Sequence, residues 1–164
     1  MNPPALEIGP DGELDFRRLP PIYAEILLQL PEILNDTEDE VRKRLFPASY
    51  PADPDKEAEW DRLSRPELFA LFSSQLEIVS QDLEGLACEP GDRGYRLRLP
   101  GSHQNAWIAA LNAARHLLAS QFSIGEADMD REPDLDAPTD KDIALLKVHL
   151  LGYIQGMIVD GAGQ

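Results

Sequence analysis

Histidine side chains are the groups in this chain best suited to metal binding or proton transfer, because imidazole titrates near neutral pH and binds zinc. The chain has three: His103, His116 and His149. No two of them are three or four residues apart, the spacing that places two imidazoles on one helix face. A zinc site would therefore have to be assembled by the tertiary fold, and a metallohydrolase of that kind is one hypothesis.

The acidic segment 125–142 contains a second candidate for metal binding. Asp128, Asp130 and Glu132 alternate as the first ligands of a calcium loop do. The glycine of such a loop would fall at Pro133 and its closing glutamate at Thr139. We therefore interpret the segment as a solvated loop rather than as a calcium site.

Cys88 is the only cysteine, so the chain forms no internal disulfide. Its neighbour Glu89 is acidic, and a nearby negative charge disfavours the reactive thiolate. With 30 acidic residues in the chain, a pair of carboxylates chosen from sequence alone says nothing about catalysis. We predict no catalytic, cofactor-binding or metal-binding residues, and no cofactor.

A proline-rich connection between residues 44 and 63 gathers aromatic side chains. Phe46, Tyr50 and Trp60 lie around three prolines, which fix the backbone and reduce the entropy lost on ordering. Either the rings pack inward and close one end of a helical bundle, or they form a docking patch edged by arginines. The candidate interaction patch is Arg44, Leu45, Phe46, Pro47, Tyr50, Trp60 and Arg62.

The formal net charge of -15 repels phosphate backbones and anionic lipid headgroups. We therefore expect neither nucleic acid nor a membrane as partner, and Lys147 and His149 interrupt the most apolar segment. Residues 1–19 do not combine a basic segment with an apolar run, so no secretory leader is expected. These features predict a cytoplasmic protein with a protein partner, and leave its oligomeric state open.

Strict alternation of apolar and polar residues predicts short strands. Leu14 to Phe16 and Tyr95 to Leu99 alternate in this way, and Leu6 to Ile8 suggests a hairpin with the first. A lone strand would leave its backbone groups unpaired. We therefore expect Leu14 to Phe16 to pair with Tyr95 to Leu99.

Helical periodicity and capping residues account for most of the remaining chain. Pro20 and Pro21 suit the start of a helix that Pro31 kinks or splits, and Thr37 with Glu40 suits the start of another. Further helix starts are expected at Asp53, Ser64, Ser102 and Thr139.

Three of these helices carry a stripe of apolar residues that we expect to be buried. The first stripe is Leu68, Phe72, Leu76, Val79 and Leu83. The second is Trp107, Leu111, Ala114 and Leu118. The third is Ile143, Leu146, Leu150, Ile154 and Met157.

Together these patterns predict a mainly α protein, a single-domain helical bundle over residues 1–164 with a small two-stranded antiparallel β element. Residues 125–142 are expected to form an acidic mobile loop inside it. One domain of this length buries about 70% of its unfolded surface, enough for a core without a disulfide.

The stretch RLFPASYPADPDKEAEWDRLSRPEL, residues 44–68, resembles the signature of a bacterial domain-of-unknown-function family that is best represented in actinobacteria. Trp107 with Arg115, and Gly152 with Gln155, resemble two later motifs of that family, whose closing helix is richer in tryptophan than this one. Genes of the family are often found near the gene of ClpS, the adaptor of the Clp protease. The resemblance thus implies a link to regulated proteolysis.

We therefore predict a cytosolic protein-interaction or regulatory protein, linked to ClpS and Clp-dependent proteolysis, rather than an enzyme. An alternative is a transcription-linked regulator that acts through a protein such as a sigma factor, because the net charge favours basic partners. The metallohydrolase is the second alternative.

Overall fold

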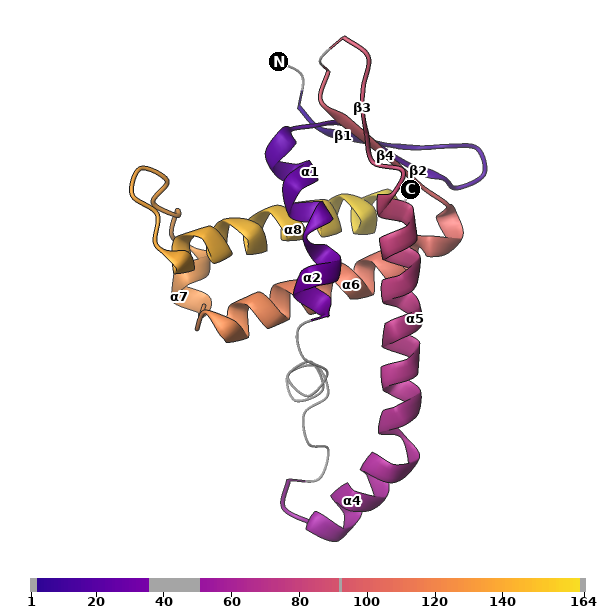
Figure 1. Ribbon diagram of the computed structural model, residues 1–164, viewed down its shortest axis with the longest axis vertical. Coiled ribbons are helices and arrows are strands. Elements are labelled where there is room, and N and C mark those ends of the chain that lie inside the picture. Colours follow the sequence, from indigo (N-terminus) through magenta and orange to yellow (C-terminus); the bar gives the residue numbers. More distant parts are fainter. Residues whose placement is uncertain (1–2, 36–50, 92, 163–164) are drawn as a thin grey trace.

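The computed structural model describes residues 3–35, 51–91 and 93–162. The helix expected after Thr37 lies outside these ranges, as do five patch residues: Arg44, Leu45, Phe46, Pro47 and Tyr50. The described part is mainly α-helical, as predicted, with one antiparallel sheet (Figure 1).

The sheet has four strands rather than the two that we predicted. They are β1 (Ala5–Ile8), β2 (Leu14–Leu19), β3 (Ala87–Cys88) and β4 (Tyr95–Leu99), in the order β1-β2-β4-β3. The central pair, β2 with β4, is the predicted one, and Leu14 faces Leu99 in its register. Two open edges of this pair are each covered by a neighbouring hairpin strand, which satisfies backbone groups that would otherwise be unpaired.

One face of the sheet is apolar and the other is charged. Leu14, Phe16 and Leu97 are buried against the helices, whereas Asp15 and Arg96 between them form a two-bonded ion pair on the opposite face, with N–O distances of 2.9 and 2.7 Å. This alternation is the expected pattern of an antiparallel sheet with one solvated face.

A bulge interrupts β2 before its last residue. Arg18 has a positive φ of 57°, and the pairing register shifts between Phe16 and Leu19. The buried Glu89 carboxylate accepts hydrogen bonds from the Arg18 amide at 2.9 Å and from Arg17 Nε at 2.5 Å. Burial raises the pKa of Glu89, but these two contacts outweigh it and hold the pKa below its ordinary value.

The first helical segment is split, as Pro31 predicted. α1 (Pro21–Leu28) ends before Gln29. α2 (Leu30–Leu34) begins directly after Gln29 and has Pro31 in its first turn. A proline has no amide to donate, so it suits this position and cannot continue the preceding helix.

Four longer helices follow, with two short ones. They are α4 (Pro54–Leu63), α5 (Arg65–Leu83), the 3-10 turn η1 (Gly101–His103), α6 (Gln104–Gln121), α7 (Glu126–Met129) and α8 (Asp140–Ala162). The caps predicted at Asp53 and Thr139 are present. Ser64 makes no side-chain cap, and α6 is preceded by His103 rather than capped by Ser102.

α6 and α8 lie side by side and form the centre of the core, with α1 and α2 crossing them and α5 beside α6 (Figure 1). The predicted stripe of α6 is buried, and Trp107 is 0% exposed. On α5 the stripe is buried from Phe72 to Leu83, whereas Leu68 is exposed. The core therefore ends partway along α5.

The structure changes the buried stripe that we predicted for α8: one position is exposed and three are only half-buried, although two of these three still pack against the core. Ile154 is buried, but Ile143 is exposed and Leu146, Leu150 and Met157 are half-buried. The stripe that packs into the core is instead Ala144, Leu145, Val148, Leu151, Ile154 and Ile158. α8 is apolar on both sides, so periodicity alone did not identify the inner one.

α8 is also long and apolar enough, over Asp140–Gly161, to span a membrane by length and composition. Core helices share this property. In this structure 39% of its most apolar window is buried inside the protein, where it packs on α6.

Candidate functional site

α4 and the N-terminal part of α5 extend away from the rest of the described molecule (Figure 1). α4 buries no residue, and its main neighbour among the described elements is α5. We call α4 and residues 65–71 of α5 the arm. Asp53 caps the start of α4, because its carboxylate accepts a hydrogen bond from the Lys56 amide at 3.2 Å. At its other end the arm continues into the core-bound half of α5, which attaches it to the rest of the molecule.

The arm displays apolar side chains that the core does not use. Leu63 is 58% exposed and Leu71 is 57% exposed, with Leu68 exposed between them. A shallow hollow of about 330 Å³ lies along α4. Its described lining is Lys56, Glu59, Trp60, Leu63 and Ser64.

Two of the predicted patch residues can be placed, and both lie on α4. Trp60 is half-buried and lines the hollow, whereas Arg62 is exposed on the same helix. Whether the aromatic rings of the patch gather together stays a prediction, because the other five patch residues lie outside the described ranges. Sequence reasoning did not single out the arm leucines, since Leu68 belonged to an apparently continuous buried stripe.

The arm is acidic. Residues 53–67 contain six acidic residues (Asp53, Asp55, Glu57, Glu59, Asp61 and Glu67) against three basic ones (Lys56, Arg62 and Arg65), a difference of -3. Apolar side chains set among carboxylates suit a partner that is apolar and basic.

We call the described part of the chain without the arm the body. A polar contact inside the body joins α5 to the start of α6. Asp82 Oδ2 lies 2.8 Å from His103 Nδ1 and accepts a hydrogen bond from Trp107 Nε1 at 2.9 Å. A buried indole N–H needs an acceptor, and the carboxylate supplies it while also orienting the imidazole. This arrangement holds two helices together, and sequence reasoning missed it.

The predicted histidines do not form a metal centre in the part of the chain that the structure describes, where no group of three or more potential ligands comes together. His103 and His116 lie near opposite ends of α6, about 20 Å apart at the rise of an α-helix. These two imidazoles therefore cannot share one ion. His149 lies on α8.

Arg115 joins α6 to α8. Its Nη1 donates to Gln155 Oε1 at 2.9 Å, and its guanidinium lies against Gly152, where an added Cβ would sit 3.0 Å from Cζ. The buried Nε has no hydrogen-bond partner. Gly152 therefore allows close packing between the two helices, and the two later motifs of the sequence meet at this contact.

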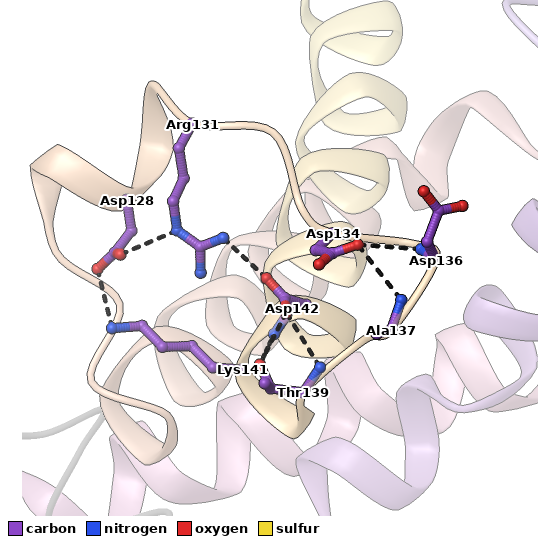
Figure 2. Close-up of polar contacts among 8 residues, drawn as sticks. All are labelled: Asp128, Arg131, Asp134, Asp136, Ala137, Thr139, Lys141 and Asp142. Atoms are coloured by element: carbon purple, nitrogen blue, oxygen red, sulfur yellow. Dashed lines mark hydrogen bonds and ion pairs between the residues drawn. The ribbon is translucent and has the colours of Figure 1, made fainter.

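The acidic segment after α6 contains an ordered set of ion pairs (Figure 2). Arg131 bridges Asp128 and Asp142, with N–O distances of 3.3 and 2.7 Å, and Lys141 also contacts Asp128 at 3.2 Å. These contacts tie α7 to the start of α8. That the segment is mobile stays a prediction.

Asp142 is the buried centre of this cluster. Besides the bond from Arg131, its Oδ2 accepts from the amide and the hydroxyl of Thr139 at 3.0 and 2.8 Å, which completes the cap of α8 (Figure 2). The Arg131 guanidinium first, and then Thr139, hold the pKa of Asp142 far below its ordinary value. The carboxylates of Asp128 and Asp142 are both bound by protein groups. The cluster therefore has a structural role, and we call it the clasp.

The fold is thus that of a mainly helical protein with a small antiparallel sheet, and its candidate site is the exposed apolar surface of the arm. The chain belongs to a family that is described as a domain of unknown function (DUF2017), whose model matches residues 13–162. No curated protein and no solved structure matches the chain.

Proposed function

We propose that this protein is a cytosolic protein-interaction or regulatory protein whose arm binds an apolar and basic segment of a partner. The observation that carries the proposal is the exposure of Leu63 and Leu71 on a part of the fold that contributes little to the core. Exposed leucines on a projecting helix cost solubility unless a partner covers them.

Trp60 is the residue on the described arm best suited to anchor a partner. It lines the hollow beside Leu63, and Arg62 lies on the same helix. Tryptophan and arginine are enriched among the few residues that dominate binding energies, especially where an aromatic ring meets a pocket.

Charge narrows the class of partner. The arm and its Asp53 cap together have six carboxylates against three cations, in a chain of net charge -15, so their field attracts basic surfaces and repels phosphates. Complementary charge mainly accelerates association and suppresses wrong partners, while buried apolar contacts supply the affinity.

Our first candidate partner is the ClpS adaptor or another Clp component, as the sequence resemblance implies. The experiment is affinity capture with the full-length chain from cells, followed by binding measurements with purified ClpS. We expect Clp components to be enriched by the natural chain and to be lost with Trp60→Ala and with Leu63→Asp.

Leu28→Asp is the matched control, because Leu28 on α1 is 56% exposed and far from the arm in the chain. It should capture the same proteins as the natural chain. Recovery of sigma factors or RNA polymerase in place of Clp components would support the transcription-linked alternative. Equal capture by the natural chain and both arm variants would contradict the role of the arm.

A further inference from the structure

The outer side of α8 carries a second apolar surface, separate from the arm. It consists of Ile143, Leu146, Leu150, Tyr153 and Met157, and we call it the outer stripe. Ile143 is 42% exposed and Tyr153 is 48% exposed, and the other three are half-buried. Leu150 and Met157 also pack against the core with part of their surface, so the outer stripe runs along an edge of α8 that is only partly open.

The spacing of the outer stripe indicates the shape of what covers it. Its members follow one another at steps of three, four, three and four residues, which is the a and d pattern of a coiled coil. Such a narrow seam fits the side of another helix. It spans about 21 Å at the rise of an α-helix, or two heptads.

The charges on α8 itself favour a second copy of this chain as the partner. From Ile143 to Val159 there is no acidic residue, and Lys147 is the only charged one. Two molecules of net charge -15 repel each other, and this repulsion is weakest where their facing surfaces carry no carboxylates. A basic partner, by contrast, would gain nothing from charge complementarity here.

A lipid surface fits the stripe less well. Helices that lie on membranes carry an apolar face and, on their other side, a polar face rich in lysine and arginine. The other side of α8 is instead apolar and buried in the core. The net charge also opposes binding to anionic headgroups.

One residue of the stripe is already held in place. The ring of Tyr153 packs edge to face against Tyr23 of α1, with centroids 6.1 Å apart and planes at 71°. A side chain that is ordered before binding loses less entropy when a partner covers it. Tyr153 can therefore serve as the anchor of the seam.

We propose that the outer stripe of α8 is the contact surface of a homodimer, in which α8 packs against α8 of a second copy. The seam is short, and interfaces of this small size are weak. The dimer should accordingly form reversibly at micromolar concentrations of the chain.

The test is sedimentation velocity on the full chain across a concentration series, under reducing conditions because Cys88 is exposed and free. The natural chain should show a monomer–dimer equilibrium. Tyr153→Glu and Ile143→Glu should each weaken it about tenfold or more, since a buried charge in the seam costs more than 1.4 kcal/mol. Both side chains are exposed, so both variants should stay folded, which a cooperative thermal unfolding transition checks.

Val159→Glu is the matched control, because Val159 is 51% exposed on the same helix but does not belong to the stripe. It should dimerise like the natural chain. A natural chain that stays monomeric throughout would overturn the proposal, as would a dimer that tolerates both stripe variants. Flotation of a monomeric chain with uncharged phosphatidylcholine vesicles would also overturn it, because lipid would then be the occupant.

Discussion

The two tryptophans of this chain lie in two regions that differ in burial, one at the centre of the core and the other on the arm. Trp107 is 0% exposed at the centre of the body, with its indole N–H bonded to Asp82. Trp60 lies on α4, a helix that buries no residue. The body gains its stability from buried apolar surface, whereas the arm contributes little to that core, so changes in the arm can alter binding without unfolding the protein.

The largest effect should come from the centre of the body. Trp107→Ala should lower the free energy of unfolding by about 3 to 5 kcal/mol, because it removes a fully buried ring and leaves a cavity. Urea denaturation followed by circular dichroism measures this loss. A loss below about 1 kcal/mol would mean that Trp107 is not the centre of the core.

A smaller loss is expected from the contact between α5 and α6. Asp82→Ala removes the acceptor of both Trp107 and His103 and should cost about 1 to 3 kcal/mol, since a buried indole N–H is left without a partner. Glu77→Ala, at an exposed position of the same helix, is the control and should stay within about 0.5 kcal/mol. Equal effects of the two substitutions would show that the Asp82 contact does not stabilise the body.

The clasp at the start of α8 should make stability depend on acid. The pKa of Asp142 is lowered in the folded state from 3.8, so its contribution is complete above that value and is lost as the pH falls through the folded pKa. Asp142→Asn should therefore be destabilised most at neutral pH, and its deficit should shrink below about pH 3.8.

The control for the clasp is Asp136→Asn, whose carboxylate points away from the cluster (Figure 2). Denaturation midpoints measured at several pH values compare it with Asp142→Asn. A deficit of Asp142→Asn that grows as the pH falls would contradict the assigned ion pair with Arg131.

The smallest effect on folding should be in the arm. Trp60→Ala should change the free energy of unfolding by no more than roughly 0.5 kcal/mol, while it removes the proposed anchor for a partner. The same denaturation experiment measures both tryptophan variants. If Trp60→Ala cost as much as Trp107→Ala, the arm would be part of the core after all.

The contrast between α6 and α8 explains which buried faces the sequence can predict. α6 carries polar residues such as Asn112 and Ser120 on its exposed side, so its inner face stands out by periodicity. α8 is apolar on two sides, and the choice between them depends on contacts with α6 and the sheet that no local pattern records. For the same reason the sequence did not show which apolar residues of α8 form the outer stripe.

Strand pairing was predictable where alternation was long enough. Leu14 to Phe16 and Tyr95 to Leu99 gave the central pair, whereas β3 has only two residues, Ala87 and Cys88, too few to show a period. Gly94, with a φ of 90°, brings the returning chain so close to Leu19 that an added Cβ would lie 2.6 Å from its carbonyl oxygen. Such a close approach is visible only in three dimensions.

The candidate site was predictable in part. The prolines and the Asp53 cap correctly indicated α4 with Trp60 and Arg62 on it. The exposure of Leu68 and Leu71 was not predictable, because their helix continues into the core and its sequence pattern does not show where the neighbouring helices end.

Hydrogen exchange of backbone amides, resolved along the sequence, tests the central contrast between body and arm most directly. The amides of α6 should exchange only when the whole protein unfolds, whereas those of α4 should exchange orders of magnitude faster through local opening. Protection of α4 equal to that of α6 in the isolated chain would contradict this account.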